Sequence, residues 1–196
     1  MAAMYVDIVT PDDAALPGAL LTEITEVYAS AQAFHELTGD FPDAGDIRVS
    51  QVAAALADEL SVPGSVVHLA RVRGELVAVA VTLDHHPADP GDPDPWIGLL
   101  LVHGERRREG HGRALADHLA ARFREAGRSG LRLAVLDTDA AALAFWEALG
   151  YVPIDHRPDL RRGRQCAVLR KGLAEPPGSR PEAGAAADGS PAAGDA

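Results

Sequence analysis

The stretch Leu99-Leu100-Leu101-Val102-His103-Gly104-Glu105-Arg106-Arg107-Arg108-Glu109-Gly110-His111-Gly112 decides the fold of this 196-residue chain. It runs from an apolar strand through a loop rich in arginine and glycine into a segment with leucines at helical spacing. The first N–H groups of a helix lack intrahelical acceptors and carry partial positive charge, and glycine lets the backbone approach an anion closely. Arginines add charge-assisted contacts. The stretch therefore predicts a strand–loop–helix unit that binds a phosphate group.

Two other glycine-rich phosphate loops do not fit this stretch. A P-loop requires Gly-x-x-x-x-Gly-Lys-Ser/Thr, and no lysine follows Gly110 or Gly112 at that spacing. A dinucleotide-binding fingerprint requires a third glycine, where this chain has Leu115. The alternative that stays open is a tight β-to-α turn without a ligand.

Outside this unit, helix-like and strand-like segments alternate. Apolar spacing predicts helices over residues 20–34, 49–60, 112–126 and 140–149, the last ended by Gly150. Strands are predicted over residues 5–9, 65–72, 75–83, 96–102, 131–136, 151–154 and 165–169, with a loop over 85–95. The strand 96–102 is almost continuously apolar, so we expect both of its faces to be covered. The order predicts one mixed α/β (α+β) domain with a largely antiparallel sheet.

Composition limits the classes of function. A net charge of −11 disfavours non-specific nucleic-acid binding, and no apolar run is long enough to span a membrane. The first residues do not resemble a secretory signal, and the single cysteine, Cys166, excludes an internal disulfide and a cysteine-built zinc site. We expect a cytoplasmic protein without a metal. Residues 1–173 form the predicted domain, and residues 174–196, which lack aromatic and branched aliphatic side chains, form a predicted disordered tail.

Two motifs resemble the GCN5-related N-acetyltransferase (GNAT) superfamily. Its loop pattern Gln/Arg-x-x-Gly-x-Gly/Ala, placed after a strand and before a helix, is matched by Arg107, Gly110 and Gly112. Its second motif, Asn-x-x-Ala followed by Tyr-x-x-x-Gly-Phe, has counterparts further along the chain in Asp139, Ala142, Trp146, Gly150 and Tyr151. The resemblance covers roughly residues 65–171, and the two motifs in the correct order are more specific than either alone.

The chain departs from the family pattern at three positions. Gly104 stands where the family often has proline, and Asp139 stands where it has asparagine. Aspartate still caps the following helix. Trp146 replaces the tyrosine that protonates the departing sulfur in many members, and an indole N–H has no usable acidity. We expect Trp146 to pack in the core rather than to act on the sulfur.

The resemblance implies direct transfer of an acetyl group from acetyl-CoA to a primary amine in a ternary complex. A backbone N–H near Val102 is the family's usual polariser of the thioester carbonyl. The positions implied to contact the cosubstrate are Leu100, Leu101, Val102, Arg107, Arg108, Glu109, Gly110, His111, Gly112, Arg113, Asp139 and Trp146. His111 is expected to contribute only its backbone N–H.

No general base can be identified from the sequence. The candidates are loop residues, each of which can equally be a solvated side chain: Asp84, His85, His86 and His103. By the same resemblance, Phe34, Glu36 and Asp40 are candidates for binding the acceptor, because acidic and aromatic residues follow a predicted helix there. An ordinary polar loop at a helix end is the competing interpretation.

A small-molecule amine is the favoured acceptor, and a homodimer stays open. A protein N-terminus or a lysine side chain is an alternative acceptor. A non-catalytic acyl-CoA-binding module is a second hypothesis, motivated by Trp146 and the missing base. A nucleotide-binding domain of another type is a third, and it predicts affinity for NAD or ATP over CoA.

Overall fold

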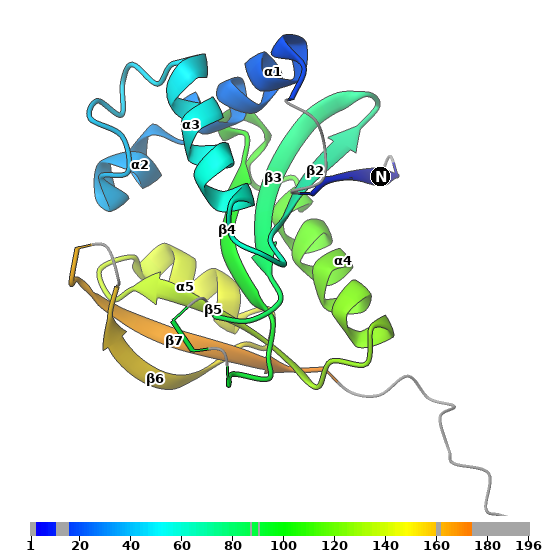
Figure 1. Cartoon of the computed structure of the whole chain (residues 1–196), viewed down its shortest axis with the longest axis vertical. Coiled ribbons are helices and arrows are strands. Elements are labelled where there is room, and N and C mark those ends of the chain that lie inside the picture. Colours follow the sequence, from blue (N-terminus) through cyan, green and yellow to red (C-terminus); the bar gives the residue numbers. More distant parts are fainter. Residues whose placement is uncertain (1–2, 11–15, 87, 90, 160–161, 174–196) are drawn as a thin grey trace, which may run out of the picture.

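A computed structural model describes residues 3–10, 16–86, 88–89, 91–159 and 162–173, and within them seven strands form one sheet in the order β1-β2-β3-β4-β5-β7-β6 (Figure 1). The strands are β1 (Met4–Val9), β2 (Val66–Val72), β3 (Glu75–Leu83), β4 (Trp96–Val102), β5 (Gly130–Leu136), β6 (Val152–Pro158) and β7 (Gln165–Gly172). The helices are α1 (Gly18–Ala29), α2 (Gln32–Thr38), α3 (Val49–Leu60), α4 (His111–Glu125) and α5 (Ala140–Glu147), with a 3-10 turn, η1 (Gly104–Arg106). Neighbouring strands are antiparallel except β4 and β5. The predicted single, mostly antiparallel α/β domain is confirmed.

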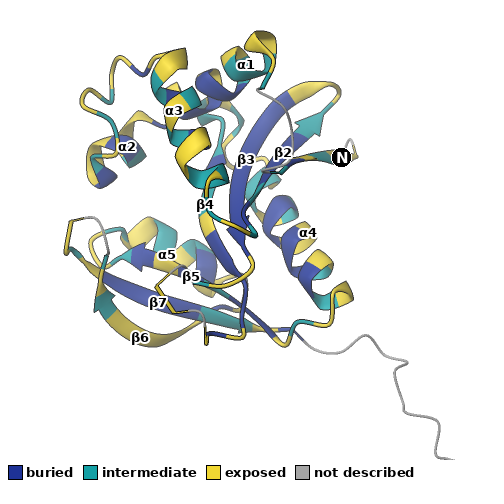
Figure 2. Cartoon of the chain, in the orientation of Figure 1, coloured by how far each residue is buried: buried dark blue, intermediate teal, exposed yellow. Residues whose placement is uncertain are grey.

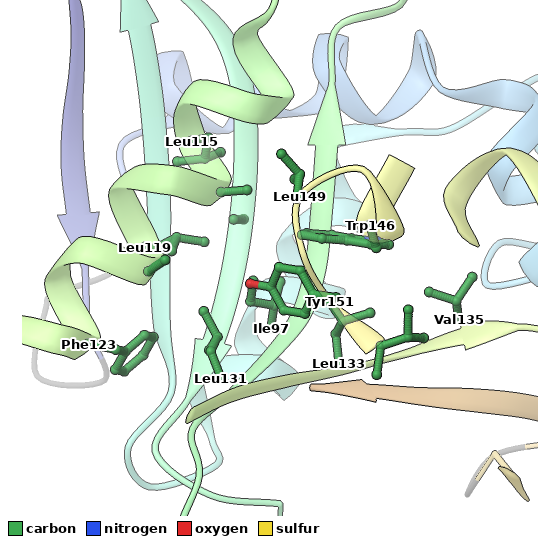
Figure 3. Packing of buried hydrophobic residues seen from close by; sticks show 14 of the residues in the cluster. Ile97, Leu115, Leu119, Phe123, Leu131, Leu133, Val135, Trp146, Leu149 and Tyr151 are labelled. Atoms are coloured by element: carbon green, nitrogen blue, oxygen red, sulfur yellow. The ribbon is translucent and has the colours of Figure 1, made fainter. Parts of the chain in front are cut away.

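Helices cover both faces of this sheet (Figure 2), and two large apolar clusters result, beside a small third one around Trp96. Alternation along β3 divides its side chains, with Ala78 and Ala80 in one cluster and Val79 and Val81 in the other. The first cluster joins the sheet to α4 and α5 through residues such as Leu115, Leu119, Phe123 and Trp146 (Figure 3). The second joins it to α1 and α3 through Ile24, Val27, Val52 and Leu56. None of the described helices is long and apolar enough to cross a membrane.

The central strands β4 and β5 are paired at only one end. Their register covers Trp96 opposite Arg132 and Ile97 opposite Leu133. At the next residue, Gly98, β4 bulges against β3. On its other edge β5 pairs with β7 along its whole length, from Gly130 to Leu136. Beyond Ile97 and Leu133, the edges of β4 and β5 that face each other have no register, so the two central strands separate. The sheet therefore contains a slot that is closed at the start of β4 and open at its end.

This slot corrects the expectation that both faces of β4 are covered. Trp96, Ile97 and Leu101 are buried, but Gly98 is exposed and Leu100 is only half-buried. The reason is the departure of β5, which removes the neighbour that would have covered these positions. The apolar sequence predicts a fully covered strand, whereas part of the strand lines an opening.

The predicted helix over residues 20–34 is also corrected, because it is two helices. α1 ends at Ala29, and α2 begins at Gln32. At the break, the Ser30 hydroxyl donates to the Val27 carbonyl at 2.7 Å and accepts from the Gly104 N–H at 2.8 Å. The chain thus changes direction where it contacts the turn after β4. The strand predicted over residues 151–154 is likewise longer and runs to Pro158 as β6. The predicted tail, 174–196, lies outside the described residues.

Candidate functional site

The loop before α4 presents unpaired backbone N–H groups. Gly110 is the N-cap residue, with a φ of 86°, and no side chain caps this helix. The first intrahelical bond runs from the Ala114 N–H to the Gly110 carbonyl at 2.9 Å, so the N–H groups of the preceding three residues have no helical acceptor. Arg108 also has a positive φ, of 64°. This backbone is suited to an anion such as a phosphate.

Gly112 is required by close packing. A Cβ atom at this position would lie 3.2 Å from the Val102 side chain and 3.4 Å from the Phe145 ring. The first turn of α4 therefore rests directly on the end of β4 and on α5. The absence of a side chain at this position brings the loop's N–H groups to the open end of the slot.

The three loop arginines do not have the same role. Arg106 forms ion pairs with Glu75 and with Glu109, the latter at 3.7 Å. Arg107 and Arg108 are exposed, and neither has an ion pair with a described residue. Glu109 also contacts the His111 ring nitrogen at 3.1 Å, so this ring has a partner within the loop. Two of the predicted arginines thus remain available for an anion.

Arg113 and Asp139 connect this region to α5. The Arg113 guanidinium donates to the Ala148 carbonyl at 3.4 Å. The Asp139 carboxylate accepts from the Ala142 N–H at 2.9 Å, so Asp139 caps α5 as the sequence predicts. Trp146 is 7 % exposed, and its ring packs against the Phe145 ring. It also packs against the Tyr151 ring (Figure 3). This burial agrees with packing in the core.

Backbone N–H groups of β4 point into the slot. The His103 N–H donates to the Val77 carbonyl of β3 at 2.9 Å. Because successive N–H groups of a strand point to opposite sides, those of Val102 and Leu100 point toward β5. β5 has already separated from β4 at this level, so it offers no acceptor. An extended ligand in the slot can accept these N–H groups.

A close backbone contact explains why residue 104 is glycine. A Cβ atom at this position would lie 2.5 Å from the Ser30 carbonyl oxygen. The Gly104 N–H also donates to the Ser30 hydroxyl, and proline has no N–H. The departure from the family's proline therefore fits the contact between the end of α1 and the turn after β4.

The four candidate bases are not brought together. Asp84, His85 and His86 follow β3, at the closed end of the slot, whereas His103 lies at the open end. The Asp84 carboxylate is 4.0 Å from the Arg128 guanidinium, and His85 is exposed. The Nδ1 atom of His103 accepts from the Glu105 N–H at 3.3 Å.

His86, among these candidates, lines a small cavity. The cavity, of about 150 Å³, also involves Ala134, Arg157 and Cys166. The Nδ1 atom of His86 accepts from the Ala88 N–H at 3.2 Å. The neutral ring must then carry its proton on Nε2, which makes that atom a donor. Burial and the nearby Arg157 lower the pKa of His86. In this geometry the ring can donate a hydrogen bond, and it accepts a proton only if it rotates.

A buried ionic network at the closed end of the slot was missed by the sequence reasoning. Asp94 is 1 % exposed and accepts from Arg132 at 2.8 Å and from Arg170 at 2.7 Å. Asp92 accepts from Arg132 at 3.0 Å and from the Trp96 indole at 2.8 Å. The network joins the starts of β4 and β5 to the end of β7. The sequence does indicate it, because two apolar strands each contain an arginine, and a buried arginine needs a charged or polar partner.

The acceptor candidates divide between a cavity wall and the core behind it. A cavity of about 590 Å³ lies between α2, the loop that follows it and Arg162 of the β6–β7 turn. Glu36 and Asp40 line it. Phe34 does not line it but packs edge-on against the His35 ring at 5.2 Å, and His35 is part of the wall. The structure therefore places two of the three candidates at one opening.

The chain belongs to the acetyltransferase (GNAT) family, whose model matches residues 26–151. An acetyltransferase from Thermus thermophilus has a TM-score of 0.65 at 20% identity, with 88% of this chain and 100% of that chain covered. The ribosomal-protein-S18-alanine N-acetyltransferase from Escherichia coli has a TM-score of 0.58 at 20% identity, with coverages of 90% and 99%. The yncA protein of Salmonella typhimurium, solved with its cofactor acetyl-CoA, has a TM-score of 0.59 at 19% identity, with coverages of 92% and 99%.

These structural likenesses show the fold. The comparison with curated protein sequences gives no match. The resemblance seen in the two sequence motifs is confirmed by the family model, which spans both motifs.

Proposed function

We propose that this protein transfers an acetyl group from acetyl-CoA to a primary amine by direct attack in a ternary complex. The observation that carries the proposal is the slot between β4 and β5, with unpaired N–H groups along it and at its open end. Family membership and a structural neighbour solved with acetyl-CoA support the choice of cosubstrate.

The residues fit such a cosubstrate. The first turn of α4, with Arg107 and Arg108, would hold the phosphates. The N–H groups of Leu100 and Val102 would hold the amide-containing arm and the thioester carbonyl. When bound, acetyl-CoA supplies an activated acyl group. Gly98 and Ala134 are exposed and directly follow the last β4–β5 pair, Ile97 and Leu133, so an amine could approach where the slot begins.

The protonation chemistry does not require an acid at Trp146. The amine nitrogen forms a bond to the carbonyl carbon, the carbon–sulfur bond breaks, and the amine loses one proton. A thiol with an ordinary pKa of about 8.5 leaves readily as thiolate near neutral pH. The attacking amine must be neutral, so we expect the rate to rise with pH toward the pKa of the amine.

Release of free CoA tests the proposal. Purified protein with acetyl-CoA and a panel of primary amines should produce CoA and the acetylated amine, detected by mass spectrometry. Arg107→Ala should weaken CoA binding, and Arg73→Ala, in the β2–β3 turn, is a matched control. Binding of CoA without turnover across the panel would favour a non-catalytic acyl-CoA-binding module. Stronger thermal stabilisation by NAD or ATP than by CoA would contradict both.

A further inference from the structure

The cavity beside α2 carries excess negative charge. Three carboxylates line it, those of Glu36, Asp40 and Asp43, against one guanidinium, that of Arg162. None of the three carboxylates forms an ion pair with a described residue. Arg162 donates to the Gly39 carbonyl at the end of α2, so its charge is directed at the helix end. The cavity is therefore built to attract a cation.

Two of these carboxylates are held by neutral donors. Glu36 accepts from the Gln32 amide at 2.8 Å, and Asp43 accepts from the Gly45 N–H at 2.8 Å. These bonds fix the positions of the oxygens and come from neutral groups, although the Asp43 carboxylate also interacts with the more distant Arg48 guanidinium. Asp40, between them in sequence, has no hydrogen bond from a described residue.

An independent observation at the same cavity is the buried imidazole of His35. This side chain is 1 % exposed and forms part of the wall, and neither ring nitrogen meets hydrogen-bond geometry with a described residue. Its ring stacks on Tyr28 at 5.7 Å and meets Phe41 edge-on at 4.9 Å. Burial lowers the pKa of His35, although Asp40 and the Tyr28 carbonyl oppose this. A neutral imidazole can accept a hydrogen bond from an ammonium group, and aromatic walls suit cations.

The cavity does not suit the amine that reacts. Carboxylates near an amine raise its pKa and keep it protonated. A protonated amine has no lone pair for attack, so binding the reacting nitrogen there would slow the transfer. The cavity suits a different nitrogen of the same acceptor, one that stays charged throughout.

We infer that the cavity beside α2 binds a second, remote ammonium group, so that the preferred acceptors are diamines or larger polyamines. The inference rests on the proposed function for the reacting end of the molecule. It assigns charge recognition to Glu36, Asp40 and Asp43, and a hydrogen-bond acceptor to His35.

Matched amines test the inference. Spermidine and 1,4-diaminobutane are compared with butylamine, which has one nitrogen. The double variant Glu36→Gln, Asp40→Asn should raise KM for spermidine and 1,4-diaminobutane by about 2- to 30-fold, the range for two solvent-accessible ion pairs, with kcat unchanged. KM for butylamine should not change. Glu26→Gln, an exposed carboxylate of α1 outside the cavity, is the control. An equal effect on all three amines, or no effect, overturns the inference.

Binding measured without turnover separates this inference from the proposed function. Calorimetric titration of spermidine into the protein with CoA should show binding that weakens as salt rises and weakens again in the double variant. His35→Phe keeps the ring packing and removes both nitrogens, so it should also weaken spermidine binding. Absence of CoA release with every amine would refute the proposed function. Absence of spermidine binding that depends on these residues would refute the inference.

Discussion

The ionic network at the closed end of the slot yields the sharpest prediction, for Asp94→Asn. The substitution keeps the shape of the side chain and removes the charge that Arg132 and Arg170 contact. Breaking a buried pair costs about 3–5 kcal/mol. We expect the lower end, about 3 kcal/mol, because Arg132 keeps its bond to Asp92 and Arg170 is 32% exposed and can be hydrated. For a chain of this size that corresponds to a fall in Tm of about 6–12 °C.

The pH dependence of the same variant gives a second readout. Burial alone would raise the pKa of Asp94, but the hydrogen bonds from Arg170 and Arg132 outweigh it and hold the pKa below its ordinary value. A carboxyl with a lowered folded-state pKa contributes stability above its unfolded pKa, and this is lost as pH falls through the folded value. The difference between the parent and Asp94→Asn should therefore be full at pH 7 and should shrink below about pH 4.

Urea unfolding followed by circular dichroism measures both quantities. Asp58→Asn, an exposed carboxylate on α3, is the matched control and should change stability by less than about 0.5 kcal/mol. A loss under about 1 kcal/mol at pH 7 would show that the network does not stabilise the closed end. A loss that is equal at pH 3 and pH 7 would show that it does not arise from the charge.

Three further predictions follow from other buried groups. Burial is the main reason that the pKa of His68 is lowered to about 4, so on acidification the unfolded chain binds the proton before the folded chain does. Lowering the pH from 7 to 5 should therefore reduce the free energy of unfolding by about 2 kcal/mol. In urea unfolding, His68→Leu combined with Thr82→Val, which removes both partners of the His68–Thr82 hydrogen bond, should flatten this pH dependence. Gly104→Ala places a Cβ atom against a backbone oxygen and should lower stability by about 1–3 kcal/mol in thermal melts, whereas Gly172→Ala, with nothing within 4 Å, should not. Trp146→Phe should lower Tm and leave the pH profile of kcat unchanged, because the indole is not an acid.

The sequence predicted what depends on local chemistry. Glycines at positive φ, an aspartate cap and a strand that enters a helix are short-range features, and the two motifs from Arg107 to Gly112 and from Asp139 to Tyr151 contain them. The break at Ser30 was not predictable in this way. Apolar spacing continues through it, since Ala31 is buried and Phe34 is half-buried. The break depends on a contact with Gly104, more than seventy residues away.

The slot and the ionic network depend on tertiary structure for a similar reason. The apolar sequence of β4 does not indicate how many of its residues pair with β5. It therefore predicts a strand that is covered on both faces along its whole length. Asp92 and Asp94 lie among prolines and glycine and have the composition of a solvated loop. Their partners, Arg132 and Arg170, come from two later strands, and only folding brings the four side chains together.

Local charge would allow a chain of net charge −11 to hold the proposed anionic cosubstrate. The sequence shows three consecutive arginines, but Arg106 is neutralised by Glu75 and Glu109. Arg107 and Arg108, beside the N-terminus of α4, form no ion pair within the described part of the chain. The carboxylates of Glu36 and Asp40, which form no ion pair among the residues that the structure describes, line the separate cavity beside α2. Opposite charges at two sites would draw an anionic donor and a cationic acceptor to different openings. The acceptor's second charge would then orient the molecule while its reacting nitrogen stays neutral, which separates binding from the proton loss that attack requires.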